Sequence, residues 1–449
     1  MLLCSVAALS AAGQAIKLPP VTRMTLPNGI RVVLMEYHRA PTLTVNAQFP
    51  GGSAQDTREK TGTASLAADL MRRGTETRSA QQLAEAVDFL GGSLGAAAGE
   101  DRLQVSLDVQ SKDTDAGLDL FADVILHSTF PAEELERERK LSVDALEAIG
   151  EDPGAVASRV ARETVYAGHP YGLEPTITSL KAISRDDILG YYRRFVVPDR
   201  MILVAVGDFK TMDMLAKLKA RFGDWPKAGT AAPVVPPVKP GARKLVLIDK
   251  PDATQTQARW TRIGFARKSP DYFAAQLADS ILGGGFTSRL IEEVRVNRSL
   301  TYGIGSGFAP HLSGGTFGVS TFTKIETTRA LINATDAVLK RAATQGLTPA
   351  ELQKVKGYMA GNYAIAMQTP EAQAAQLGDI AFYGLPNDYL QTYLPRLRSV
   401  TLAEANRIAR AYFPPDKMSL ILVAPASKVQ PQLNGLGNFE VRPVSSVGK

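Results

Sequence analysis

The chain has 449 residues, of which 45% are hydrophobic and 21% charged, so it can bury the cores of two or more globular domains. Its formal net charge is only +6, and the lysines and arginines are scattered among acidic residues instead of forming a run. This modest, dispersed charge argues against nucleic-acid binding as the main function.

The first fifteen residues, MLLCSVAALSAAGQA, form an apolar segment that ends in small residues. The pattern predicts a signal peptide cleaved after Ala15, although a basic start is absent. The alternative is an Ala-rich terminus without structure. The segment is too short to span a bilayer as a helix, and we expect the mature chain to be exported and not inserted in a membrane. Cys4, the only cysteine, would leave with the peptide.

The segment GTASLAADLMRRGT, residues 62–75, predicts an amphipathic helix. In an H-x-x-E-H motif, the histidines at i and i+4 and the glutamate at i+3 share one helix face. The histidines can then hold zinc while the glutamate polarises water. Here these positions are Ser65, Ala68 and Asp69, so the face offers a single carboxylate. The bland interpretation is an ordinary helix with Leu66 and Leu70 in the core.

The chain has four histidines, His38, His127, His169 and His311. None of them has a second histidine at i+3 or i+4. A catalytic zinc site would therefore have to be assembled from distant parts of the chain.

Local patterns predict further elements of the first half. SAQQLAEAVDFLGG predicts a helix that opens with a capping box of Ser79 and Gln82, and Ser184 with Asp187 opens another helix in the same way. FPAEEL begins a helix at Pro131. RLQVSLDVQ alternates apolar and polar residues and predicts a strand with one buried face, formed by Leu103, Val105, Leu107 and Val109.

The segment PKAGTAAPVVPPVKPGA, residues 226–242, predicts a stiff, extended, proline-rich linker near the middle of the chain. Similar patterns recur on its two sides, about 217 residues apart. Pro131 and Pro349 each begin a helix, and Pro198 and Pro415 each stand between a helix and a strand. This long offset predicts two copies of one domain and not a solenoid.

The predicted first domain comprises residues 16–225 and the second residues 243–428. Strand pairs followed by helix pairs predict an α+β fold in which helices pack on one face of a mainly antiparallel sheet. In the second domain, Thr401 with Glu404 opens a helix. Residues 429–449 are rich in Gly, Pro and Ser and are predicted to be a flexible tail.

ILGGGFTSRLIEEVRVNRSLTYGIGSGF, residues 281–308, places Arg295 near a predicted helix end and Tyr302 at a strand start. From spacing alone, the arginine is a solvated surface residue and the tyrosine half-buried packing. The run Gly283, Gly284 and Gly285 predicts a helix cap or turn, or a flexible loop. It is not a phosphate loop, because no Gly-Lys-Ser/Thr follows.

GGTFGVSTFTK, residues 314–324, alternates like a strand. An extended peptide can be held by pairing with the exposed edge of a sheet, and the sequence leaves open which strand is the edge.

NGIRVVL, FPGGSAQD and TGTASLAADLMRRGT together resemble the opening of the insulinase (pitrilysin) family of inverted-motif zinc peptidases. HPYGLEPTITSLKAISRDDILGYYRRFVVPDRMILVAVGDF is similar to the family's close of its first domain, and the resemblance extends over residues 22–426. The family's zinc-binding histidines are replaced here. Its third ligand, a Glu, aligns with Ala145 or the neighbouring Leu146, with Asp144 and Glu147 close by. The resemblance thus implies that this chain binds no metal.

Residues 281–308 resemble the family's second conserved block. Arg295 and Tyr302 match the Arg and Tyr that, in the family, reach into the active site formed by the opposite, metal-bearing domain. Both are hydrogen-bond donors suited to anchoring a peptide carbonyl and stabilising an oxyanion. Gly283 to Gly285 match a glycine-rich loop that touches the incoming peptide in some non-catalytic subunits.

In half-size bacterial members of the family, one subunit has the zinc motif and the other supplies the Arg and Tyr. The sequence resembles the second kind. This implies a periplasmic, non-catalytic subunit shaped as half of a clam shell, with zinc in a homologous H-x-x-E-H partner and with peptides or unfolded chains as substrates. Two alternatives stay open: a scaffold or peptide-binding protein without a proteolytic partner, and an autonomous hydrolase with an unorthodox site.

Overall fold

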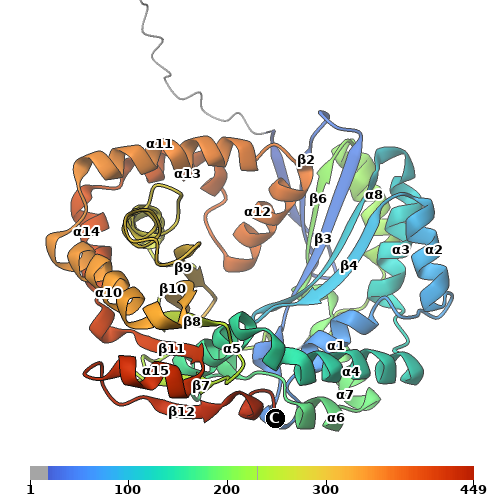
Figure 1. Ribbon diagram of the computed structural model, residues 1–449. Coiled ribbons are helices and arrows are strands. Elements are labelled where there is room, and N and C mark those ends of the chain that lie inside the picture. The colour runs from blue at the N-terminus through green and yellow to red at the C-terminus, as the bar shows by residue number, and fades with distance from the viewer. Residues whose placement is uncertain (1–18, 230) are drawn as a thin grey trace, which may run out of the picture.

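The computed structural model describes residues 19–229 and 231–449, so the expected signal peptide and Cys4 lie outside the described residues. The chain forms two halves, each built on a six-stranded sheet (Figure 1). Within the described ranges, no helix is long and apolar enough to cross a membrane.

The first sheet has the order β1-β2-β6-β3-β5-β4, and only the pair β2 and β6 is parallel. Its strands are β1 (Val21–Thr25), β2 (Arg31–Glu36), β3 (Thr42–Pro50), β4 (Ser93–Ala98), β5 (Arg102–Gln110) and β6 (Ile202–Gly207). The helices of this half are α1 (Thr63–Leu70), α2 (Ala80–Phe89), α3 (Thr114–Leu126), α4 (Ala132–Glu147), α5 (Pro153–Val165), α6 (Ile177–Ala182), α7 (Arg185–Phe195) and α8 (Thr211–Phe222). The alternating strand predicted from RLQVSLDVQ is β5, and its four apolar side chains are buried.

The second sheet has the order β12-β7-β11-β8-β10-β9, with the pairs β12–β7 and β7–β11 parallel. Its strands are β7 (Leu245–Asp249), β8 (Gln255–Ile263), β9 (Ile304–Pro310), β10 (Gly315–Lys324), β11 (Ser419–Ala424) and β12 (Glu440–Pro443). The helices are α9 (Tyr272–Leu282), a π-helix (Ile291–Asn297), α10 (Thr328–Gln345), α11 (Pro349–Ala366), α12 (Pro370–Tyr383), α13 (Tyr389–Ser399), α14 (Leu402–Tyr412) and α15 (Ala426–Val429). The predicted α+β class with mainly antiparallel sheets is confirmed.

Local signals explain where many helices begin. The side chains of Ser79, Ser184 and Thr401 accept from the N–H groups of Gln82, Asp187 and Glu404, and all three predicted capping boxes are complete. Pro349 is the first residue of α11, as predicted. Pro131 was predicted to be the first residue of α4, but α4 begins at Ala132 and Pro131 occupies the N-cap position before it. The described residues of the segment 226–242 form no helix or strand.

The segment after residue 428 differs from its prediction. It was expected to be a flexible tail, but it contains β12, which pairs in parallel with β7 and forms an edge of the second sheet. Val444 and Val447 pack against a buried apolar cluster of this half. The composition of the segment is typical of a loop. The prediction missed the strand because a partner roughly two hundred residues away, and not a local pattern, stabilises it.

Each sheet receives one helix from the other half (Figure 1). Helices of the same half cover one face of each sheet, as expected. On the opposite face, α12 of the second half packs on β3 and β6, and α5 of the first half packs on β8 and β11. Val156 and Val160 of α5 belong to one buried cluster with Ile421 and Val423. The two halves are therefore joined by an exchange of helices as well as by the linker.

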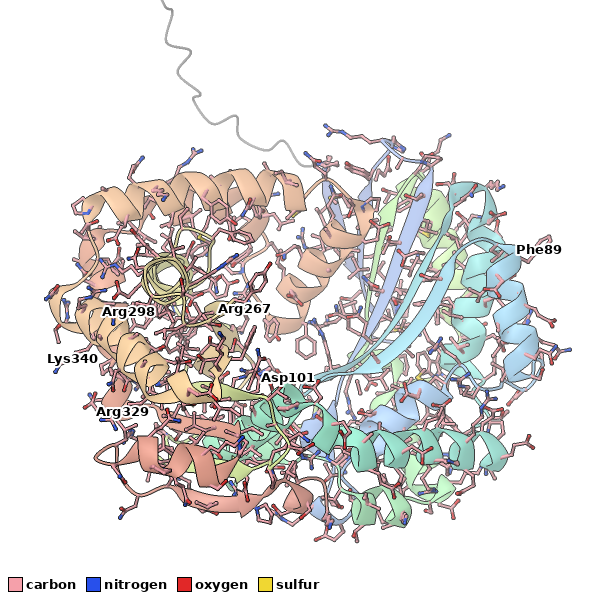
Figure 2. The ribbon with its side chains drawn as sticks, in the orientation of Figure 1. Phe89, Asp101, Arg267, Arg298, Arg329 and Lys340 are labelled. Atoms are coloured by element: carbon pink, nitrogen blue, oxygen red, sulfur yellow. The ribbon has the colours of Figure 1, made fainter. Side chains whose placement is uncertain are left out.

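The turn between β4 and β5 also ties the halves together. Arg102 pairs with Asp379 of α12 across the two halves at 2.7 Å, and Glu100 pairs at 2.6 Å with Arg162 of α5, the first-half helix that packs on the second sheet. Between them, the buried Asp101 accepts from the Tyr171 hydroxyl at 2.5 Å and from the Leu312 N–H at 2.9 Å. Figure 2 shows Asp101 where the two halves meet.

Candidate functional site

Helix α1, which contains the expected motif positions Ser65, Ala68 and Asp69, begins at a buried carboxylate. Gly62 has the left-handed φ of 110° and precedes the first turn. The Asp56 carboxylate accepts from the Gly62 N–H at 2.9 Å and the Ala64 N–H at 3.1 Å. Burial raises the pKa of Asp56 to about 7, although the hydrogen bonds from the helix start act in the opposite direction. No local sequence signal indicates this cap, because Asp56 lies outside the usual N-cap position.

The three motif positions on α1 do not form a metal site. Ser65 is exposed, Ala68 is fully buried and Asp69 is half-buried. Burial raises the pKa of Asp69, and the nearby Glu138 of α4 raises it further. Glu138 is itself paired with Arg73 at 2.6 Å. The predicted core residues of this helix, Leu66 and Leu70, are buried as expected.

The expected position of the third ligand is on α4. Ala145, Asp144 and Glu147 are all exposed, and Asp144 pairs with Lys140 at 2.7 Å. In the part of the chain that the structure describes, no group of three or more His, Cys, Asp or Glu side chains is arranged to hold a metal ion. Of the three expected ligand positions, Ser65 and Asp69 have no imidazole and Ala145 has no donor atom, so the residues present do not fit zinc.

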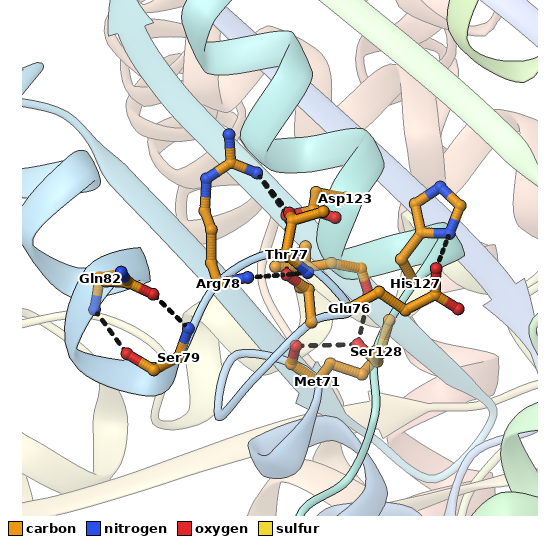
Figure 3. A network of polar contacts seen from close by, with 11 residues as sticks. Met71, Glu76, Thr77, Arg78, Ser79, Gln82, Asp123, His127 and Ser128 are labelled. Atoms are coloured by element: carbon orange, nitrogen blue, oxygen red, sulfur yellow. Dashed lines mark hydrogen bonds and ion pairs between the residues drawn. The ribbon is translucent and has the colours of Figure 1, made fainter.

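The loop after α1 is fixed by a network of polar contacts (Figure 3). The Ser128 hydroxyl donates to the Met71 carbonyl at 2.9 Å, and Arg78 pairs with Asp123 at 2.6 Å. His127 lies 3.7 Å from Glu76 in the same network. The other histidines also have nearby partners: His38 has Asp208, His169 has the Pro236 carbonyl, and His311 has Asp101.

In the second half, the structure brings Arg295 and Tyr302 together. Arg295 lies in the π-helix and Tyr302 directly before β9, and the guanidinium carbon is 5.0 Å from the centroid of the tyrosine ring. The Tyr302 residue is 80% exposed, so it is not the half-buried packing residue of the bland interpretation. Among the described residues, Arg295 has no carboxylate partner. Short π-helices occur frequently at functional sites.

Neighbouring residues anchor this segment. Arg289 binds Glu351 through two nitrogens, at 2.6 and 2.7 Å, and Leu290 and Val294 are fully buried. Ser299 adopts a positive φ of 51° where the chain leaves the π-helix. The backbone is thus held on the core while the pair of Arg295 and Tyr302 remains available to a ligand.

The three glycines have different surroundings. A Cβ on Gly283 would overlap with the backbone and side chain of Ser306, and one on Gly284 would press on the end of α9. Gly285 has open space around its Cα, and the next residue, Phe286, is 84% exposed. Packing therefore explains the first two glycines, and only Gly285 and Phe286 present a free loop surface.

The strand predicted over residues 314–324 is β10, which lies between β8 and β9. It is an inner strand and has no free edge. Of the described strands, the second sheet has β9 and β12 at its edges. An added peptide strand could therefore pair with β9 or β12 but not with β10, and of these two edges β9 is the one that follows Tyr302 in the chain.

Comparison with known proteins places these features in a family. A model described as insulinase (peptidase family M16) matches residues 31–177, and one described as peptidase M16 inactive domain matches residues 182–359. An uncharacterized zinc protease of Mycobacterium tuberculosis is 28% identical over 395 residues, which cover 86% of this chain and 90% of the relative. A non-peptidase homolog of Helicobacter pylori is 23% identical over 411 residues, 89% of this chain and 93% of the relative.

A solved structure shares the architecture. The crystal structure of a peptidase M16 inactive domain from Pseudomonas fluorescens has a TM-score of 0.85 and 27% sequence identity. The match covers 90% of this chain and 98% of that chain.

Proposed function

The chain belongs to the insulinase family of zinc proteases, peptidase family M16, and on that premise we propose that it is a non-catalytic, substrate-binding subunit of a heterodimeric peptidase. Its partner is a homologous H-x-x-E-H protein that holds zinc. The substrate is a peptide or an unfolded protein chain, and the complex works in the bacterial periplasm.

One contrast between the two halves supports this proposal. The motif positions of the first half do not fit zinc, because Ser65 and Asp69 replace both histidines and Ala145 has no donor atom. In the second half, by contrast, Arg295 and Tyr302 contact each other at the surface, and the arginine has no carboxylate partner in the described chain. Two donors held outward on an anchored segment can bind a group that this chain does not provide.

The chemistry assigned to this pair is the orientation of the substrate. The guanidinium and the phenol are hydrogen-bond donors, and they hold the scissile carbonyl in place and stabilise negative charge that develops on its oxygen. Zinc chemistry belongs to the partner. Gly285 and Phe286, which form an exposed loop surface of the same segment, contact the rest of the peptide.

The names of the relatives are compatible with loss of catalysis in part of the family. One relative is a non-peptidase homolog, and the similar Pseudomonas fluorescens structure is of an inactive domain, whereas the Mycobacterium tuberculosis relative is named a zinc protease. The residues at the ligand positions of this chain support grouping it with the relatives named non-peptidase and inactive.

The deciding test uses the complex purified from the native cells through a tag on this chain, identified by mass spectrometry. Arg295→Ala and Tyr302→Phe should each lower kcat/KM of that complex by roughly 10²-fold, because each removes one donor to the oxyanion. Zinc content should stay unchanged. Arg298→Ala is the matched control, since Arg298 is an exposed neighbour paired with Glu293.

Unchanged kinetics in both variants would remove the proposed role. Recovery of only this chain, or of proteins without H-x-x-E-H, would favour the scaffold or peptide-binding alternative. Chelator-sensitive cleavage by the purified chain alone would favour an autonomous hydrolase.

A further inference from the structure

A second cleft lies in the same half but contains no residue of the segment 281–308. Its volume is about 390 Å³, and it is bordered by the start of α9, the connection between α12 and α13, and α14. Arg267 lines it together with the aromatic residues Tyr272, Phe273 and Tyr389. Figure 2 shows Arg267 in the second half, on its side toward Asp101.

Arg267 is unusual because it is a buried cation without a counter-charge. The residue is only 8% exposed. Its guanidinium carbon lies 3.8 Å from the centroid of the Tyr272 ring, and one terminal nitrogen donates to the Tyr389 hydroxyl at 3.1 Å. Within the described residues, no carboxylate is at ion-pair distance from it. The acid that acts on its charge, Asp379, is already bound by Arg102 at 2.7 Å.

The other charges around the cleft do not neutralise this cation. Arg396 and Lys268 also line the cleft and have no carboxylate partner among the described residues. The one acid in the lining is Glu404, whose carboxylate accepts from the N–H and hydroxyl of Thr401 at the start of α14. Burial of an unpaired charge is costly, so buried cations normally have an anionic partner. In this cleft, none of the residues that the structure describes supplies that partner.

We propose that the cleft around Arg267 binds a carboxylate of a peptide, either the C-terminus or an acidic side chain. The Tyr272 ring covers one face of the guanidinium and leaves its N–H donors to a ligand that approaches in the guanidinium plane. The planar fork of N–H donors in that plane matches a carboxylate and binds it through two parallel hydrogen bonds. The tyrosines and Phe273 provide apolar walls for the residue that bears the carboxylate.

The choice of a peptide as ligand rests on the proposed function, whereas the anion site rests on the geometry of this chain alone. For that reason the test uses the isolated full chain without any partner. Unchanged kinetics of the Arg295 and Tyr302 variants in the complex would leave the result of this binding test unaffected. Failure of the peptides to bind at Arg267 would likewise leave the kinetic test unaffected.

The experiment measures fluorescence anisotropy with three dye-labelled peptides of the same alanine- and serine-rich sequence. One has a free C-terminus, one is C-terminally amidated, and one is amidated but contains an internal glutamate. The free-carboxylate peptide should bind roughly tenfold or more tightly than the neutral amide, because a hydrogen-bonded charge pair is lost in the amide. Comparison of the two carboxylate peptides shows which source the site prefers.

The variants are Arg267→Lys, which keeps the charge but removes the fork, and Arg396→Gln, which removes a cation at half-buried depth. Both should weaken binding of the carboxylate peptides and leave the neutral amide unchanged. Arg407→Gln is the matched control, because Arg407 also lines the cleft but is already paired with Asp271 at 2.5 Å. Circular dichroism checks the fold, and if Arg267→Lys is unfolded the comparison rests on Arg396→Gln.

Equal binding of the three peptides, or wild-type affinity in the folded variants, would overturn the proposal. Competition by inorganic phosphate as strong as that by the free-carboxylate peptide would also overturn it, because the site would then be a general oxyanion site.

Discussion

Single side chains decide what α1 can do, and Asp56 is the clearest case. Its carboxylate is buried under the first turn of the helix that, by its position, would hold the metal, and it accepts two N–H groups of that turn. Two effects compete there: burial favours the neutral acid, and the hydrogen bonds favour the anion. With a folded pKa of about 7, burial dominates.

The first prediction follows from the sign of this shift. Between the ordinary aspartate pKa of about 4 and the folded value of about 7, the folded chain binds a proton that the unfolded chain does not. The contribution of Asp56 to the free energy of unfolding therefore decreases as pH rises through this window. Relative to Asp56→Asn, the wild type should lose about 2 to 3 kcal/mol between pH 5 and pH 8.

Urea denaturation of both proteins at the two pH values measures this difference, and titration of all other groups cancels in the comparison. A flat difference would mean that the helix start keeps the carboxylate ionised at both pH values. A difference of opposite sign would show that the hydrogen bonds outweigh burial.

Residues whose role depends on local spacing could be predicted from the sequence, and those that depend on distant partners could not. The absence of the H-x-x-E-H residues at Ser65, Ala68 and Asp69 can be read from the i, i+3, i+4 spacing of one helix. Nothing in the sequence around Arg267 indicates that it is buried among tyrosines from α9 and α13. The same holds for Asp101, whose partners lie far along the chain.

At the scale of elements, the glycine run shows how a loop combines packing and exposure. Gly283 meets Ser306 of β9, whose hydroxyl donates to the buried Asp279 of α9 at 2.5 Å. Burial raises the pKa of Asp279 to about 6, against the effect of this hydrogen bond. The start of the loop is therefore fixed between a helix and a strand, and its freedom begins at Gly285.

The second prediction separates these roles. Gly283→Ala should destabilise the chain by about 1 to 3 kcal/mol, because the added methyl overlaps with backbone atoms that cannot move away. Gly285→Ala, its matched control, should stay within about 0.5 kcal/mol, since nothing lies closer than 3.8 Å to the new methyl. Urea denaturation measures both. Equal stability of the two variants would contradict the different packing assigned to the two glycines.

The variant Gly285→Ala also tests the proposed contact of the loop with substrate. In the complex with the catalytic partner, Gly285→Ala should raise KM at unchanged stability. An unchanged KM would limit the glycines to a structural role.

Elements with their own start signals were predictable, and an element stabilised from outside was not. Capping boxes such as Ser79 with Gln82 are complete within four residues, and β5 has a full alternating pattern. In contrast, β12 has only four residues, and Pro, Gly and Ser surround it. Its hydrogen-bonding partner, β7, comes from the other end of the second half, so composition predicted a tail where the chain forms a strand.

At the scale of the whole molecule, the exchange of α5 and α12 makes each half incomplete. The face of the first sheet under α12 includes Ile202, Val204 and Val206, which are fully buried. The face of the second sheet under α5 includes Ile421 and Val423, which are also fully buried. Each such side chain contributes about 1.5 to 3 kcal/mol when it is removed from water. Neither half can therefore bury both faces of its sheet without the helix from the other half.

The third prediction is that the halves behave as one folding unit. Although the linker joins them covalently, the exchanged helices and the pair of Arg102 with Asp379 hold them together without it. A protease site inserted at Gly241, which is exposed and has free space around it, allows the folded chain to be cut there. The two fragments should co-elute in gel filtration and unfold in one thermal transition.

Expressed separately, each fragment should aggregate, because an apolar sheet face becomes exposed. Separation of the cut fragments into two folded monomers would show that the exchanged helices contribute little. The variant Leu377→Ala removes a buried contact of α12 with the first sheet, so it should make the cut fragments separate more readily.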